Sequence, residues 1–202
     1  MRILVVGSTG GTGPHILRDA VARGHEVTAL DRRPEALDGI KGMVRVASAD
    51  ARDVEAMAEA IAGQDAVIVS VSGGDDKRHQ VVATRVVEAM HLAGVRRLVF
   101  TSAYGIVATR PLLTAGLTRR RNRDLFADQL AADEVVAASD LDWTIARATR
   151  LTEDDSSKPA RVETELLARG PWSLGRTAWA TALVDFVEQG SHIRETVNVT
   201  GG

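Results

Sequence analysis

The chain has 202 residues, of which 45% are hydrophobic and 26% charged, and its formal net charge is −2. This composition is typical of a globular protein with a sizeable core, and the near-neutral charge excludes a general attraction to nucleic acid or to an anionic membrane. The chain contains no cysteine, which excludes disulfides, thiolate catalysis and cysteine-ligated metals, and we expect a cytoplasmic location. No apolar run approaches the roughly 18 residues of a membrane span, so no membrane partner is expected.

Short apolar segments alternate with longer helical segments along the chain. We expect strands at residues 2–6, 26–31, 43–47, 66–70, 97–102, 142–146 and 196–199. Helices are expected between them at residues 12–23, 53–61, 77–93, 122–138 and 176–189. Most of these strands are unbroken apolar runs, which is typical of strands covered on both faces. The repeated strand-then-helix order predicts an α/β fold with a doubly wound parallel sheet and helices on both faces.

Two stretches between these elements, residues 103–121 and 148–175, have no regular pattern and are expected to be irregular. Both follow the carboxyl ends of predicted strands, where ligands bind in open α/β sheets. No repeat, low-complexity linker or composition boundary divides the chain. We therefore expect a single domain over residues 1–202, with a small substrate side built from these two loops.

A glycine-rich loop, GSTGGTG at residues 7–13, follows the first predicted strand and opens the first predicted helix. In such loops the glycines make the turn and let backbone N–H groups approach a pyrophosphate, whose charge the helix N-terminus complements. No Lys-Ser/Thr pair follows the last glycine, so the loop is not a P-loop. The context predicts a dinucleotide site, with a plain glycine turn as the alternative. The candidate binding residues here are Gly7, Thr9, Gly10, Gly11, Thr12 and Gly13.

The spacing G-x-x-G-x-x-G differs from the G-x-G-x-x-G of ordinary Rossmann dehydrogenases and resembles that of the atypical short-chain dehydrogenase/reductases. In particular, the chain is similar to the small NmrA-like group, which includes flavin and biliverdin reductases. The resemblance covers nearly the whole chain and includes, in the same order, VTALDRRPE, SADARD, RRLVFTSAYG, SDLDWTIAR and TVNVTG. It implies a Rossmann-type fold and an NAD(P) cofactor.

The segment LDRRP at the end of the second predicted strand bears on the choice of cofactor. In such folds an acid about 20 residues after the glycines accepts a hydrogen bond from the adenosine ribose, and Asp31 lies close to that spacing. A carboxylate there favours NAD, whereas Arg32 and Arg33, which follow it, carry the side chain suited to a 2′-phosphate. The resemblance implies that Arg32 holds that phosphate, although relatives usually carry an apolar residue in place of Asp31. We expect NADP, with NAD as the open alternative and a solvated turn as the purely structural one.

Further candidate contacts with the cofactor follow later predicted strands. The resemblance implies that Asp50 and Ala51 flank the adenine, although Asp50 can equally cap a turn. The segment SVSGG at residues 70–74 brings small residues to a point where the backbone passes close to the dinucleotide, although a plain turn would need the same glycines. The remaining candidates are Ser70, Val71, Ser72, Gly73, Thr101 and Arg147. Similar proteins carry Arg-Pro where this chain has Arg147 and Ala148.

Ser102 and Tyr104, in TSAYG at the end of the fifth predicted strand, are the catalytic candidates. In ordinary short-chain dehydrogenases a tyrosine transfers the proton, a lysine four residues later lowers its pKa, and a serine polarises the carbonyl. Here position 108 is alanine, and none of the three lysines falls in the following helix. Without a cation, Tyr104 should titrate near ~10, which makes it a poor proton shuttle at neutral pH. We expect it either to contact substrate or cofactor, or simply to be packed or exposed.

The predicted helix at residues 122–138 offers a substitute carboxylate. Phe126, Leu130, Asp133 and Ala137 share one stripe, so Asp133 would face inward, where burial raises a carboxyl pKa. The alternative is a hydrated carboxylate at the edge of the stripe. Gln129 stands where the resemblance implies a basic residue, which weakens the case for acid–base catalysis.

The segment TRRRNR at residues 118–123 is the strongest local charge cluster. It clamps an anionic substrate, covers the cofactor phosphates as a lid, or forms a solvated loop leading into a helix. Nucleic-acid binding lacks the interleaved aromatics and overall basicity that it needs. The five histidines show no metal-ligand spacing, so no metal is expected.

Together these features favour an NAD(P)H-dependent oxidoreductase that reduces a small conjugated acceptor such as a flavin or quinone. The first alternative is a non-catalytic NAD(P)-binding sensor that binds a protein partner, as some NmrA-like proteins do. An epimerase- or dehydratase-like enzyme is disfavoured by the chain length and the absent tyrosine–lysine pair. The expected partner is a small-molecule acceptor, and the oligomeric state stays open.

Overall fold

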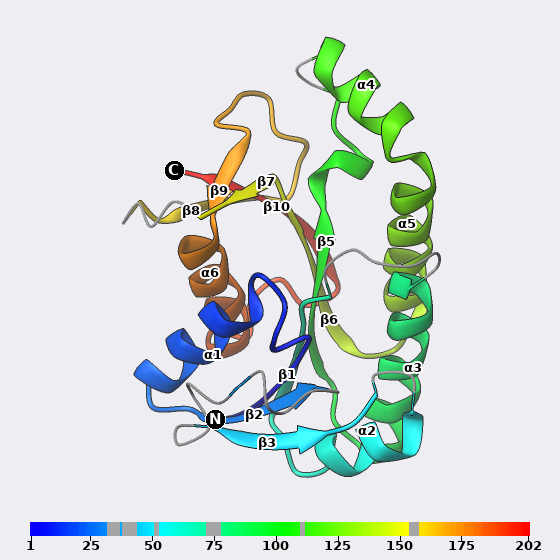
Figure 1. Cartoon of the computed structure of the whole chain (residues 1–202), viewed down its shortest axis with the longest axis vertical. Helices are drawn as coiled ribbons and strands as arrows, with labels where there is room; N and C mark the ends of the chain where they lie inside the picture. Colours follow the sequence, from blue (N-terminus) through cyan, green and yellow to red (C-terminus); the bar gives the residue numbers. More distant parts are fainter. Residues whose placement is uncertain (32–36, 38–43, 51–52, 72–77, 110–111, 154–157) are drawn as a thin grey trace.

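The computed structural model describes residues 1–31, 37, 44–50, 53–71, 78–109, 112–153 and 158–202 (Figure 1). Its central sheet has eight strands in the order β3-β2-β1-β4-β5-β6-β10-β8. The strands are β1 (Arg2–Val6), β2 (Glu26–Asp31), β3 (Arg45–Ser48), β4 (Ala66–Val69), β5 (Arg97–Ala103), β6 (Asp142–Ala148), β8 (Ala160–Glu163) and β10 (Glu195–Gly201). Neighbouring strands are parallel except β8 with β10. The predicted α/β fold is confirmed, with one antiparallel strand at its edge.

Helices cover both faces of this sheet (Figure 1). On one face lie α1 (Gly13–Ala22) and α6 (Arg176–Glu188), and on the other lie α2 (Val54–Ile61), α3 (Arg78–Ala93) and α5 (Arg123–Ala138). Successive side chains of a strand point to opposite faces, so an unbroken apolar strand serves both layers. In β1, Ile3 and Val5 join the core under α1 and α6, whereas Leu4 and Val6 join the core under the other helices.

The parallel strands bring the candidate residues to one edge of the sheet, because their carboxyl ends all reach it. Each candidate sits at or directly after the end of a different strand. The glycine loop follows β1, Asp31 ends β2, Ser70 follows β4, Ser102 lies near the end of β5 and Arg147 near the end of β6. None of the described helices is long and apolar enough to cross a membrane.

The prediction that residues 103–121 and 148–175 are irregular was wrong. The first stretch holds the 3-10 helix η2 (Tyr104–Ile106) and α4 (Leu112–Arg121), and the second holds β7 (Arg150–Thr152), β8 and β9 (Ser173–Gly175). β7 and β9 pair in a separate two-stranded sheet. Strands this short carry too few residues to show an alternation, and residues 116–121 of α4 are all exposed, so this part of the helix has no apolar stripe.

Candidate active site

The glycine loop is shaped by two close backbone approaches. Gly7 has a φ of +82°, and a Cβ there would lie 2.2 Å from the carbonyl oxygen of Ser70. A Cβ on Gly13 would lie 2.3 Å from the carbonyl oxygen of Ser8. Among the described residues no side chain caps α1 at Thr12, and the first turn of α1 contains no acidic residue. The loop therefore has the narrow, uncapped and locally positive shape that a dinucleotide pyrophosphate fits.

Asp31 lies directly beside this loop. Its Oδ2 accepts a hydrogen bond from the backbone N–H of Thr9 at 3.2 Å and another from the Thr9 hydroxyl at 2.5 Å. Arg32 and Arg33, the predicted 2′-phosphate ligands, lie outside the described residues. Asp31, the acid that was predicted to accept from the adenosine ribose, thus contacts the glycine loop from the end of β2.

The remaining predicted cofactor contacts differ in how they are placed. Ser70 is buried, and its N–H donates to the carbonyl of Val6 at 2.9 Å. The carbonyl of Asp50 accepts from the Asp53 N–H at 2.9 Å in the turn that leads to α2. Val71 and Thr101 are half-buried, whereas Ala51, Ser72 and Gly73 lie outside the described residues.

Arg176, the first residue of α6, lies over the glycine loop, and the sequence reasoning missed it. Its Cζ and Nη1 lie 3.0 Å from the position that a Cβ of Gly11 would take. Nη1 donates to the Thr12 hydroxyl at 3.4 Å, and Nε donates to Oε1 of Glu153 at 2.6 Å. The packing of α6 on α1 brings this guanidinium to the loop from more than 160 residues away, so no local sequence pattern points to it.

A partly buried polar cluster joins the ends of β5 and β6 to α5. Ser102 Oγ donates to Oδ2 of Asp133 at 3.1 Å, and Arg147 donates to the same oxygen from Nε at 3.0 Å and from Nη2 at 2.9 Å. Ser102 and Arg147 are neighbours in the register of β5 and β6. Asp133 is only 3% exposed, and burial raises its pKa against the opposing effect of Arg147. Its Oδ1 is buried without a partner in the described part of the chain.

Asp133 takes the inward one of the two positions that the sequence left open, but the stripe on which that alternative was based was wrong. Leu130 is 40% exposed and Ala137 is also exposed. The buried residues of α5 are Asp128, Ala132, Asp133 and Val136. The helix carries carboxylates on its inner face, so apolar residues alone do not mark that face.

A second buried pair, also missed in the sequence, lies where α3 meets α5. Oδ2 of Asp128 accepts from the N–H of His79 and contacts its Nδ1, both at 2.9 Å, and Oδ1 accepts from the N–H of Gln80 at 3.1 Å. Asp128 thereby caps the first turn of α3. Within the described residues, Nε2 of His79 and Oε1 of Gln129 are buried without partners. The layer between α3 and α5 is therefore more polar than an ordinary helix contact.

Tyr104 is buried rather than open to a ligand-sized space. Its hydroxyl accepts from the N–H of Leu167 at 3.0 Å and donates to the carbonyl of Leu167 at 3.5 Å. The ring stacks on Trp172, with centroids 6.4 Å apart. Burial raises the pKa of Tyr104 above its ordinary value. Of the two predicted roles, this environment matches the packed tyrosine.

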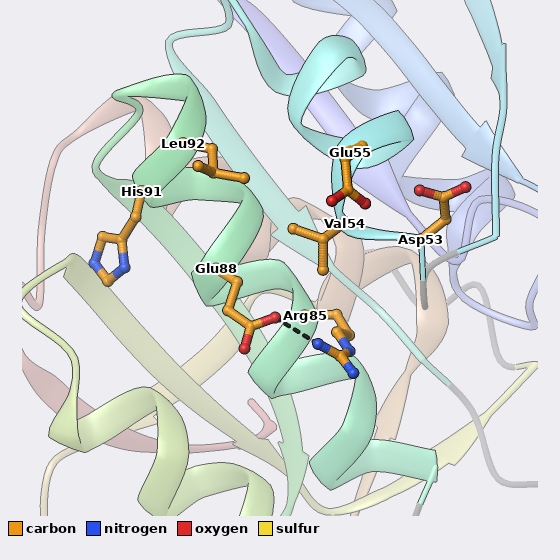
Figure 2. Close-up of a pocket in the computed structure, with 7 residues that line it drawn as sticks. All are labelled: Asp53, Val54, Glu55, Arg85, Glu88, His91 and Leu92. Carbon is orange, nitrogen blue, oxygen red and sulfur yellow. Dashed lines mark hydrogen bonds and ion pairs between the residues drawn. The ribbon is translucent and has the colours of Figure 1, made fainter.

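Two further surface features belong neither to the glycine loop nor to the polar cluster. Arg119, Arg120 and Arg121 form the exposed end of α4 rather than a loop, and Arg119 Nη2 donates to the carbonyl of Ala108 at 2.7 Å. Figure 2 shows a surface pocket between α2 and α3 whose lining residues are Asp53, Val54, Glu55, Arg85, Glu88, His91 and Leu92. It contains none of the predicted site residues. Among the described residues, no His, Asp and Glu side chains gather as a metal site.

A family model described as NAD(P)H-binding matches residues 7–189. The chain belongs to this NAD(P)H-binding family. The expected NAD(P) cofactor is thereby confirmed.

Individual proteins agree with this membership. The chain is 34% identical to 2-alkyl-3-oxoalkanoate reductase from Stenotrophomonas maltophilia over 149 residues, which are 68% of this chain and 44% of that protein. The chain thus spans less than half the length of the curated relatives it matches.

Solved structures share the whole fold. The oxidoreductase ylbE from Lactococcus lactis superposes with a TM-score of 0.87 at 23% identity, covering 100% of this chain and 91% of that one. The anaerobilin reductase ChuY from Escherichia coli O157:H7 gives 0.86 at 19%, covering 99% and 97%. A short-chain dehydrogenase/reductase from Veillonella parvula, solved in complex with NADP, gives 0.85 at 18%, covering 98% and 94%. The predicted resemblance to atypical short-chain dehydrogenase/reductases is confirmed.

Proposed function

We propose that this chain of the NAD(P)H-binding family reduces a small conjugated acceptor, such as a flavin or a quinone, with NADPH as the preferred donor. The observation that carries the proposal is the partly buried Ser102–Asp133–Arg147 cluster, which lies on the same sheet edge as the glycine loop. The family supports the cofactor. The reductases among the relatives and structural neighbours support the direction of the reaction.

The reduced cofactor supplies a hydride, and the chain must supply or admit one proton. Ser102 is the group at the end of β5 that can donate it, because its hydroxyl already lies 3.1 Å from a buried carboxyl. When Asp133 is protonated, its proton passes to Ser102 Oγ as the serine hydroxyl proton passes to the acceptor, and Asp133, left as a carboxylate beside Arg147, regains a proton from solvent before the next turnover. Arg147 holds the carboxyl in place through two N–H groups on one oxygen. This relay replaces the tyrosine–lysine pair that position 108 breaks.

Tyr104 has a positioning role in this proposal. Both hydrogen bonds of its hydroxyl go to the backbone of Leu167, so it holds the segment around residue 167 against η2. We assign the substrate side to residues 103–121 and 148–175 of a single domain.

A non-catalytic dinucleotide sensor is the second candidate. The environment of Tyr104 favours this candidate. Its hydroxyl is hydrogen-bonded to backbone groups and its pKa is raised, which makes it a poor proton donor. Both candidates bind the cofactor, but only the reductase turns it over.

The deciding experiment measures NADPH consumption without oxygen, with FMN or menadione as acceptor, in wild type, Ser102→Ala and Asp133→Asn. We expect the wild type to consume NADPH. Ser102→Ala should lose about 100-fold of this turnover, or about 2.7 kcal/mol, while its affinity for NADPH stays unchanged. Ser139→Ala is the matched control, because Ser139 only caps the end of α5 through the carbonyl of Val136. NADPH binding without any turnover would favour the sensor. Failure to bind either nicotinamide cofactor would remove both.

A further inference from the structure

The guanidinium of Arg176 is placed as a lid residue on the glycine loop rather than as part of a surface ion pair. Its side chain is 23% exposed, whereas that of its partner Glu153 is 76% exposed. An ion pair with one partner this open to water contributes only about 0–1 kcal/mol. The ion pair with Glu153 therefore does not by itself account for an arginine at position 176. The contacts of Arg176 with the glycine loop are more informative.

The guanidinium of Arg176 packs against the glycine loop. Nη1 and Nη2 lie 3.0 and 3.2 Å from the position of a Cβ on Gly11, so any larger residue there would push the guanidinium away. Glu153 engages Nε, the planar face of the guanidinium covers Gly11, and Nη1 reaches Thr12. The Nη1–Nη2 edge, which Glu153 does not engage, is one with which arginine binds phosphate oxygens in pairs.

The start of α6 adds to the positive character of this place. The N-terminal turns of α1 and α6 lie together, since Thr177 Oγ1 and His15 Nδ1 are 3.3 Å apart. Neither first turn contains an acidic residue, and Gly175 at the start of α6 has no side chain to cap it. Two helix ends and one guanidinium thus converge on the same loop.

We propose that Arg176 is a pyrophosphate-binding residue of the cofactor site, contributed from the start of α6 beside the glycine loop. Glu153 orients the guanidinium through Nε, so that Nη2 and the second N–H of Nη1, whose other N–H donates to Thr12, can bind the phosphates. The inference rests on the proposed function only for the presence of a dinucleotide.

The test is calorimetric titration with NADPH, NADH and adenosine 2′-monophosphate, which lacks the pyrophosphate. We expect Arg176→Ala to weaken NADPH and NADH by similar factors of at least about tenfold, or about 1.4 kcal/mol. Binding of adenosine 2′-monophosphate should stay unchanged. Arg176→Lys should recover part of the loss, because lysine keeps the charge without the paired geometry. Arg18→Ala is the matched control, since it removes one exposed arginine from α1 and should leave all three affinities within about twofold.

The outcomes separate this inference from the proposed function. Wild-type binding with an unchanged Arg176→Ala variant overturns the role of Arg176 and leaves the reductase standing. An equal loss for adenosine 2′-monophosphate also overturns it, because Arg176 then supports the shape of the site rather than the pyrophosphate. If wild type binds no dinucleotide, the proposed function fails and the pyrophosphate site fails with it. Thermal unfolding of each variant without ligand shows whether its fold is intact.

Discussion

Asp31, the last residue of β2, is hydrogen-bonded to Thr9 in the glycine loop through both the backbone N–H and the hydroxyl of Thr9. Both bonds reach the same oxygen, Oδ2, at 3.2 and 2.5 Å. The carboxylate therefore has a structural task in addition to any contact with the adenosine ribose, because it ties the loop after β1 to the neighbouring strand. A substitution that keeps the acceptor oxygen can separate this task from the effect of the charge.

Asp31→Asn should shift the cofactor preference toward NADPH. The amide oxygen can still accept from Thr9, whereas the negative charge that repels a 2′-phosphate is gone. We expect the ratio of the NADH to the NADPH dissociation constant to rise by about tenfold, or about 1.4 kcal/mol. Thr9→Ala, which removes one hydrogen bond and no charge, should change both affinities together. An unchanged ratio in Asp31→Asn would show that Asp31 takes no part in the choice.

Gly7→Ala should be far more damaging than Gly24→Ala. The two glycines have nearly the same left-handed φ, +82° and +81°, so both variants carry the backbone cost of about 1–2 kcal/mol. At Gly7 the new Cβ also meets the Ser70 carbonyl at 2.2 Å, whereas at Gly24 no described atom lies within 4 Å. Urea unfolding should show an additional loss of about 1–3 kcal/mol for Gly7→Ala.

NADPH titration of the same two variants completes this comparison. Gly24→Ala should bind as the wild type does, because Gly24 lies at the other end of α1. Gly7→Ala should lose binding, because the loop can accept the Cβ only by moving away from β4. Equal stability and equal binding in the two variants would contradict the close approach at Ser70.

The sheet was predictable from the sequence because its strands are continuous apolar runs with helices between them. β1 and β2 have the predicted ends, residues 2–6 and 26–31. The glycine loop and Asp31 were predictable for a related reason, since their spacing is local. Arg176 and the His79–Asp128 pair were not, because their partners lie in distant parts of the chain. Short strands such as β7 and β9 depend on tertiary pairing and leave no periodic signal.

Tyr104 should titrate above its ordinary pKa of ~10. Because it is the only tyrosine in the chain, the phenolate absorbance in an alkaline titration reports this group alone. Burial raises its pKa, so the hydroxyl contributes stability below the unfolded value that is lost as the pH rises through the folded value. The folded protein should therefore titrate at higher pH than the same protein in urea.

Tyr104→Phe provides the control and tests the positioning role. The variant should lose the alkaline absorbance change and retain reductase turnover within about tenfold. A loss of more than about 100-fold, or about 2.7 kcal/mol, would restore tyrosine as the proton donor. A wild-type midpoint at or below that of the unfolded chain would contradict the buried hydroxyl.

Asp133→Asn should remove a component of stability that falls with rising pH. Burial raises the folded pKa of Asp133 above its unfolded value of about 3.9, so the folded state binds this proton more tightly. The carboxyl then contributes stability that is fully present below that unfolded value and is lost as the pH rises through the folded one. In urea unfolding at a series of pH values, the wild-type free energy of unfolding minus that of Asp133→Asn should fall over this window.

Asp65→Asn is the opposite control, because hydrogen bonds from Arg2 lower the pKa of Asp65. The wild-type free energy of unfolding minus that of Asp65→Asn should therefore rise with pH. A rising difference for Asp133 would mean that Arg147 keeps the carboxyl ionised throughout, and the proton relay through Ser102 would then have no source.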